Sequence, residues 1–105
     1  MDSLELVERV FRKMRILILL ILEERGCCSF TELRDILKTY RGVVAQKVKE
    51  LEMLGLVETS FELNKQSKPF KKICLTKKGK EVVKLLKRLI EVLSYEECEE
   101  QESQT

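Results

Sequence analysis

Residues 29–57 read SFTELRDILKTYRGVVAQKVKELEMLGLV and predict two short helices joined by a tight turn. Ser29 and Glu32 have the spacing of a capping box, in which each side chain satisfies a free backbone N–H at a helix start. Apolar residues then recur at helical steps in two groups, and Gly55 is expected to end the second helix. The first group is Phe30, Leu33, Ile36 and Leu37, and the second is Val44, Val48, Leu51 and Leu54. The stretch 29–55 is therefore predicted to be a helix-turn-helix.

The sequence after residue 55 changes from a helical period to a period of two. Leu56–Leu63 and Phe70–Leu75 are rich in strand-forming residues, and the polar segment between them ends in Pro69, the only proline. Residues 56–75 are therefore expected to form a hairpin with a basic tip, a wing. Thr76 can cap a last helix over 76–97 with a wide apolar face, and 98–105 is expected to be an acidic tail.

The sequence before residue 29 predicts an N-terminal helix, or a helix pair broken near Arg12 and Lys13, over residues 1–25. Asp2 or Ser3 can cap its start, and from 14 to 22 it is apolar nearly all round except at Arg15. Such a helix must be buried on two sides. The expected fold is α+β but mostly α, a single domain over 1–105.

Length and charge place further limits on the chain. The longest apolar run, Ile16–Leu22, has seven residues, whereas crossing a bilayer takes about 20. No signal peptide is recognisable, so we expect a cytoplasmic protein without membrane contact. Residues 38–88 hold 14 Lys and Arg against 5 Glu, a net +9, so the rest sums to −7 within the total of +2. A basic middle favours a polyanionic partner, although it is equally compatible with a solvated face.

Cysteine and histidine usage argues against metal or catalytic chemistry. The chain has no histidine, and its cysteines are Cys27, Cys28, Cys74 and Cys98. They lack metal-site spacing, and no activating partner is visible for a nucleophile, so we expect no metal, no cofactor and no enzymatic activity. Small buried hydrophobes are the favoured interpretation of the cysteines. A disulfide stays open, because abundant Lys, Glu and Arg with one Asn is typical of thermophiles, in which intracellular disulfides occur.

Three segments resemble motifs of winged helix-turn-helix transcription regulators of the ArsR, MarR and PadR-like families, of an archaeal or archaeal-virus type. Arg15–Leu20 is similar to the core helix, Val48–Val57 to the recognition helix running into the wing, and Leu75–Lys80 to the junction that closes the wing. This resemblance implies a winged helix that binds DNA. It does not extend to metal sensing, because the cysteine and histidine set is missing, and nothing marks a pocket for a small-molecule effector.

The resemblance also implies site residues. The recognition-helix set is Tyr40, Arg41, Gly42, Val43, Ala45, Gln46, Lys47 and Lys49. Arg can pair with guanine and Gln with adenine in the major groove, and Val43 or Ala45 could meet a thymine methyl. The wing set, suited to phosphates, is Lys65, Gln66, Ser67, Lys68, Lys71 and Lys72. The alternatives are an ordinary hydrated helix face and an edge strand protected by lysines.

The expected function is sequence-specific binding of double-stranded DNA by a homodimeric transcription regulator. The first and last helices carry more apolar surface than one small core needs. The candidate dimer contacts are Leu4, Val7, Phe11, Leu86, Leu89, Ile90 and Leu93. The alternatives are a winged-helix protein-interaction module in a larger assembly and a non-specific DNA-coating protein.

Overall fold

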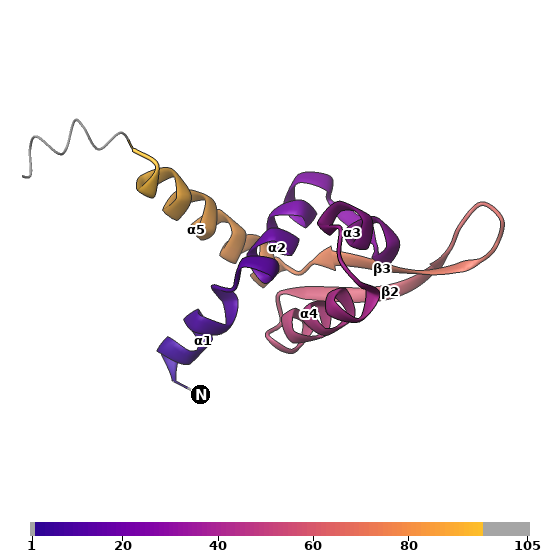
Figure 1. Cartoon of the computed structure of the whole chain (residues 1–105), viewed down its shortest axis with the longest axis horizontal. Helices are drawn as coiled ribbons and strands as arrows, with labels where there is room; N and C mark the ends of the chain where they lie inside the picture. Colours follow the sequence, from indigo (N-terminus) through magenta and orange to yellow (C-terminus); the bar gives the residue numbers. More distant parts are fainter. Residues whose placement is uncertain (1, 96–105) are drawn as a thin grey trace, which may run out of the picture.

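The computed structural model describes residues 2–95 and contains, within them, five helices and three strands (Figure 1). The predicted α+β, mostly α, winged helix-turn-helix fold is confirmed. Residues 96–105, with Cys98, the end of the predicted last helix and the acidic tail, lie outside the described residues. The elements are α1 Ser3–Val10, α2 Lys13–Arg25, β1 Cys27–Ser29, α3 Phe30–Leu37, α4 Arg41–Met53, β2 Val57–Leu63, β3 Pro69–Leu75 and α5 Lys77–Leu93.

The three strands form an antiparallel sheet in the order β1-β3-β2. In the β2–β3 hairpin the register runs from Val57 opposite Leu75 to Leu63 opposite Pro69. Strand β1 was not predicted, because three residues between Gly26 and the capping box are too few to display an alternating pattern. It pairs Cys27 with Cys74 and Ser29 with Lys72, so the start of α3 lies against the wing.

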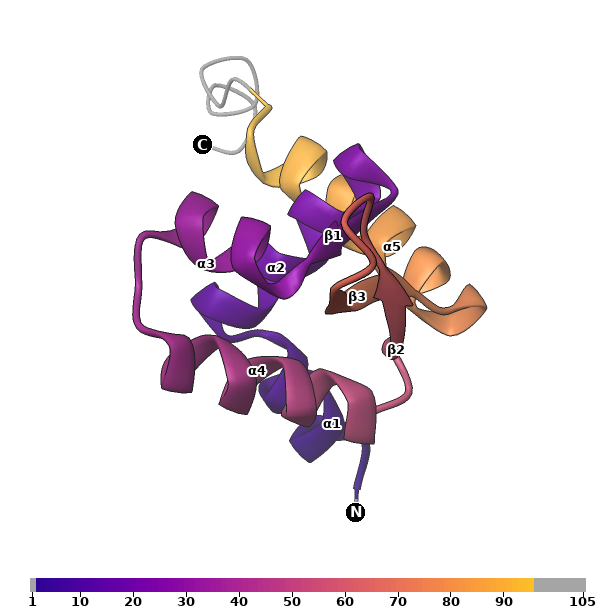
Figure 2. The same ribbon diagram turned by 90° about the vertical axis from the view of Figure 1, so that its right-hand side faces the viewer.

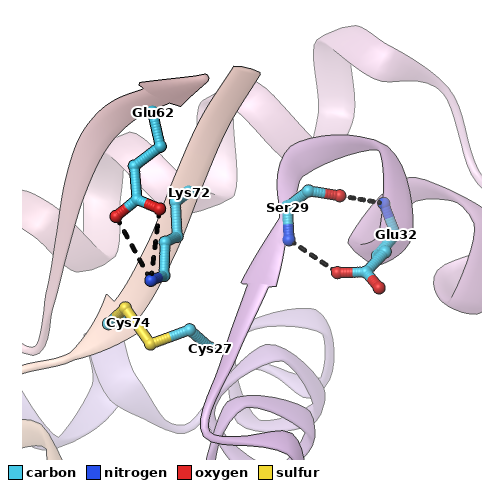
Figure 3. The surroundings of a disulfide bond; sticks show 6 residues. All are labelled: Cys27, Ser29, Glu32, Glu62, Lys72 and Cys74. Atoms are coloured by element: carbon cyan, nitrogen blue, oxygen red, sulfur yellow. Dashed lines mark hydrogen bonds and ion pairs between the residues drawn. A yellow bond between two sulfur atoms is a disulfide. The ribbon is translucent and has the colours of Figure 1, made fainter. Parts of the chain in front are cut away.

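Side-chain caps fix the starts of three helices. Asp2 Oδ1 accepts from the Glu5 N–H at 2.8 Å, and Thr76 Oγ1 accepts from the Gly79 N–H at 2.9 Å. The predicted capping box at α3 is confirmed: Ser29 Oγ accepts from the Glu32 N–H at 3.0 Å, and Glu32 Oε1 accepts from the Ser29 N–H at 2.8 Å (Figure 3). These bonds satisfy backbone donors that a helix leaves free in its first turn.

The core forms where α2, α3, α4, the start of α5 and the sheet meet. Helix α2 contributes three fully buried residues and α4 contributes the predicted stripe, apart from Leu54, which is half-buried at the helix end. The fully buried side chains are Ile18, Leu19, Leu22, Cys28, Leu33, Val44, Val48, Leu51, Leu56, Ile73 and Val83. Their burial fixes which faces of α3 and α4 remain in solvent.

Cys27 and Cys74 form a disulfide that joins β1 to β3, with an S–S distance of 2.05 Å (Figure 3). The sequence pattern left this bridge open and favoured buried thiols, which holds for Cys28: this cysteine is free and 2% exposed. Burial, supported by the charge of Glu32 and opposed by that of Arg25, raises the pKa of the Cys28 thiol. A protonated, buried thiol of this kind is chemically inert.

The molecule is elongated, with extents of 62 × 31 × 25 Å. The wing projects from one end, while α1 and α5 extend from the opposite end (Figure 1). In the perpendicular view, α3 and α4 lie on one side of the body, and the strands and α5 lie on the other (Figure 2). Among the helices of residues 2–95, none combines the length and the apolar character needed to cross a membrane.

Candidate nucleic-acid interface

Helix α4 presents a polar face to solvent because its opposite face is anchored in the core. Val44, Val48 and Leu51 are at most 1% exposed. From the predicted recognition set, five residues of α4 and the residue before it are exposed: Tyr40, Arg41, Gly42, Ala45, Gln46 and Lys49. This face offers a guanidinium, a carboxamide and a small apolar residue for contact with base edges.

Two residues of the predicted recognition set are less available than the sequence suggested. Val43 is half-buried, and Lys47 is half-buried with its Nζ 3.6 Å from Glu50 Oε1. Residues at the border between the exposed and the buried face of a helix pack partly against the rest of the protein. Lys47 therefore has an internal partner that Lys49 lacks among residues 2–95.

The start of α4 is open toward solvent. Its N-cap, Tyr40, is 81% exposed, and within the described chain its side chain makes no capping hydrogen bond. A Cβ built on Gly42 would meet open space, with nothing described within 4 Å. Free N–H groups at a helix start favour nearby anions.

The wing tip is a structured turn that holds its basic residues in solvent. Asn64 Oδ1 accepts from the N–H groups of Gln66 and Lys68, each at 2.9 Å, and Ser67 adopts a left-handed backbone with φ 59°. The four predicted tip residues are all exposed: Lys65, Gln66, Ser67 and Lys68. The tip thus presents two exposed lysine side chains on a hydrogen-bonded turn.

Lys71 and Lys72, which the sequence pattern grouped together, point to opposite faces of the wing, because successive strand residues alternate. Lys72 shares its face with Cys74, and its Nζ lies 3.2 Å from Glu62 Oε2 (Figure 3). Lys71 lies on the side of α3 and α4, 5.9 Å from the ring centroid of Phe30. Of these two lysines, only Lys71 therefore lies on the face of the wing that is turned toward α3 and α4.

An open cleft of about 900 Å³ separates the start of α4 from the wing. Its lining includes Arg41, Ala45 and Lys71, together with three aromatic residues that the sequence pattern did not indicate as site residues: Phe30, Phe61 and Phe70. Phe61 is 75% exposed. The helical stripe indicated that Phe30 belongs to the core, and only the β1–β3 pairing brings it to this cleft.

Arg15 connects α4 to the N-terminal helices. This residue is 9% exposed, its Nε donates to Glu50 Oε1 at 3.0 Å, and its Nη1 donates to the Arg9 carbonyl. Glu50 is only partly desolvated, which acts to raise its pKa, but the hydrogen bonds and positive charges of Arg15 and Lys47 prevail and lower it. Helix α4 is thus tied to the junction between α1 and α2.

An apolar groove of about 370 Å³ lies between α1 and α5. Its walls include Leu6, Val7 and Phe11 on one side and Leu85 and Leu89 on the other. Of the predicted dimer contacts, Leu86 is an exception, because it is 4% exposed and belongs to the core of the single chain. The other predicted contacts are exposed: Leu4, Val7, Phe11, Leu89, Ile90 and Leu93.

An exposed polar helix, α4, beside a projecting basic hairpin is the arrangement of a winged helix-turn-helix protein, a fold of the DNA-binding, transcription-regulating class. The chain belongs to the HxlR-like helix-turn-helix family, whose model matches residues 10–101. No curated protein matches the sequence significantly. Within residues 2–95, no group of His, Cys, Asp and Glu is arranged to hold a metal ion.

Solved structures of transcription regulators share the fold. A transcriptional regulator homologue from Pyrococcus horikoshii is 24% identical with a TM-score of 0.71, over 86% of this chain and 94% of that one. A PadR family regulator from Clostridium difficile is 22% identical with a TM-score of 0.71, over 84% and 97%. A MarR mutant from E. coli, solved with operator DNA, is 20% identical with a TM-score of 0.68, over 81% and 59%.

Proposed function

We propose that the protein regulates transcription by binding a specific double-stranded DNA site as a symmetric homodimer. The observation that carries this proposal is the exposed face of α4 beside the basic wing. Gln46 and Ala45 are exposed on this face and are suited to base edges, and Lys65 and Lys68 are exposed at the wing tip and are suited to phosphates. The family is one of DNA-binding regulators and does not suggest catalysis.

The homodimer is supported by the apolar surfaces of α1 and α5. Within the described chain none of the eight residues of α1 is buried, yet this helix carries Leu4, Leu6 and Val7. A second copy related by a two-fold axis would cover the same patch on both chains. Two recognition helices would then meet successive major grooves about 34 Å apart on a roughly palindromic site.

The test is a binding titration against a selected site and a random duplex. The site is obtained by selecting bound fragments from the source genome, and both duplexes are titrated across a salt series. Gln46→Ala removes a possible bidentate contact with adenine, so it should cost about 1–3 kcal/mol on the selected site and much less on the random duplex. Lys65→Ala should weaken both duplexes alike and reduce the salt slope by about one unit.

Each alternative function gives a different result. A protein-interaction module would bind neither duplex, and a DNA-coating protein would bind both equally at every salt concentration. If the wild type prefers the selected site but Gln46→Ala leaves that preference unchanged, α4 does not determine the sequence preference.

A further inference from the structure

Two cations from different elements lie over one aromatic ring in the cleft between α4 and the wing. The Arg41 guanidinium carbon is 5.6 Å from the centroid of the Phe30 ring, and Lys71 Nζ is 5.9 Å from it. Both distances fall within the roughly 6 Å over which a ring face attracts a cation. Arg41 begins α4 and Lys71 belongs to β3, so Phe30 connects the recognition helix to the wing.

The position of Phe30 follows from the chain on either side of it. Phe30 is the first residue of α3 and directly follows Ser29, which pairs with Lys72 across β1 and β3. That pairing places the ring beside Lys71, the preceding residue of β3. The Cys27–Cys74 bridge at the other end of β1 fixes the same pairing covalently. The ring is therefore held by the fold and does not depend on the two cations.

Neither of these two cations forms an ion pair with an acidic side chain among residues 2–95. Neither Arg41 nor Lys71 has a carboxylate within 4 Å in that part of the chain, whereas the adjacent Lys72 pairs with Glu62. Glu32 also lines the cleft, but its Oε1 accepts the N–H of Ser29 in the capping box. Two like charges repel each other, and an anion bound between them would relieve that repulsion.

We propose, building on the DNA-binding function proposed above, that Phe30 positions Arg41 and Lys71 as one binding site for the phosphate backbone of DNA. The recognition helix and the wing then grip the same stretch of backbone through a shared aromatic support. On this basis Arg41, which the sequence suggested as a contact with guanine, contacts a phosphate instead. Gln46 and Ala45 then make the contacts with base edges. Phe30 itself is a positioning residue.

The test is a mutant cycle titrated against the selected and the random duplex across a salt series. Arg41→Gln and Lys71→Gln should each weaken binding to both duplexes alike and reduce the salt slope by about one unit. Phe30→Leu, which keeps an apolar side chain but removes the ring, should weaken both about 2- to 5-fold, the strength of an exposed cation–π contact. In a chain that already carries Arg41→Gln and Lys71→Gln, Phe30→Leu should have no further effect.

Two controls separate positioning from packing. Phe30→Tyr keeps the ring face and should bind like the wild type. Ile36→Ala trims an apolar side chain of the same helix, α3, that does not line the cleft, and it should leave affinity unchanged. Melting curves identify any variant that fails to fold, in which case Phe30→Tyr and the two cation variants carry the test.

Three outcomes would overturn the inference. The first is that Phe30→Leu lowers DNA affinity equally whether or not Arg41 and Lys71 are present. The second is that Phe30→Leu binds DNA as tightly as the wild type. The third is that Arg41→Gln loses affinity only for the selected site. A wild-type protein that binds neither duplex would instead refute the DNA-binding function itself.

Discussion

Gly79 is the residue with the tightest steric requirement. A Cβ at this position would lie 2.0 Å from the carbonyl oxygen of Leu56, which is backbone and cannot rotate away. Gly79→Ala should therefore force α5 away from the start of β2 and destabilise the fold by about 1–3 kcal/mol, as overpacked sites do. Urea denaturation measures the change, and an unchanged midpoint would contradict this close approach.

Unlike Gly79, Gly42 has room for a side chain, because a Cβ there would meet open space. Alanine favours helix over glycine by about 1 kcal/mol, so Gly42→Ala should stabilise the protein by up to that amount. If DNA backbone approaches the start of α4, the same methyl group should weaken DNA binding. A gain in melting temperature with unchanged affinity would show that DNA does not approach at this point.

Glu50 makes stability depend on pH through its bonds with Arg15. Its pKa is lowered in the folded protein, so the stabilisation is present above the ordinary glutamate pKa and is lost as the pH falls through the folded value. Glu50→Gln should cost about 1–3 kcal/mol at neutral pH, because Arg15 loses a charged acceptor. The loss should shrink in acid, whereas Glu58→Gln, an exposed strand residue, should change little at either pH. Urea denaturation of both variants from neutral to acidic pH gives the comparison.

At the level of elements, the disulfide fixes the short strand β1 to β3. Cys27 and Cys74 are 47 residues apart in sequence, and closing a loop of that size stabilises a fold by about 4 kcal/mol in the chain-entropy model. Reduction, or the pair Cys27→Ser and Cys74→Ser, should therefore lower the melting temperature by many degrees. Cys28→Ala should cost less, because it only trims a small buried side chain.

DNA binding should nevertheless survive loss of the bridge at temperatures where the chain remains folded. Neither cysteine lies on the exposed face of α4 or at the wing tip. Titration of the folded double variant with the selected duplex is the measurement, and a folded variant that no longer binds would show that the bridge holds the interface itself.

The helices and the wing hairpin could be predicted because each carries its own local signal. Apolar spacing indicated α4 and α5, and the spacing of Ser29 and Glu32 indicated the start of α3. Strand β1 carries no such signal, since its three residues become a strand only through pairing with β3. The same pairing decides the disulfide partner and the position of Phe30. The cleft therefore depends on contacts between distant residues, which periodicity does not encode.

At the scale of the molecule, the described chain is more extended than a compact domain of similar length. Its radius of gyration is 16.5 Å, whereas a compact domain of about 100 residues has a value near 13 Å. The extension comes from the wing at one end and from α1 and α5 at the other (Figure 1). Leu4 is 75% exposed and Leu93 is 72% exposed at the end away from the wing. A second copy that covers this end would bring the assembly closer to ordinary compactness.

The proposed homodimer is tested by introducing lysines at the end of the molecule opposite the wing. Leu4→Lys with Leu93→Lys should weaken dimerisation at least tenfold, because burying each leucine in an interface contributes about 1.5–3 kcal/mol. The matched control is Leu63→Lys, an apolar residue of the wing that is 67% exposed and should leave the dimer intact. Sedimentation equilibrium at micromolar concentration should give twice the chain mass of 12.3 kDa for the wild type and the control, and a mass shifted toward one chain for the double variant.

Because two half-sites are then no longer bound together, the double variant should also lose affinity for a palindromic site while keeping its affinity for random DNA. A wild type that sediments as a single chain would exclude the homodimer, and an unaffected double variant would place the interface elsewhere.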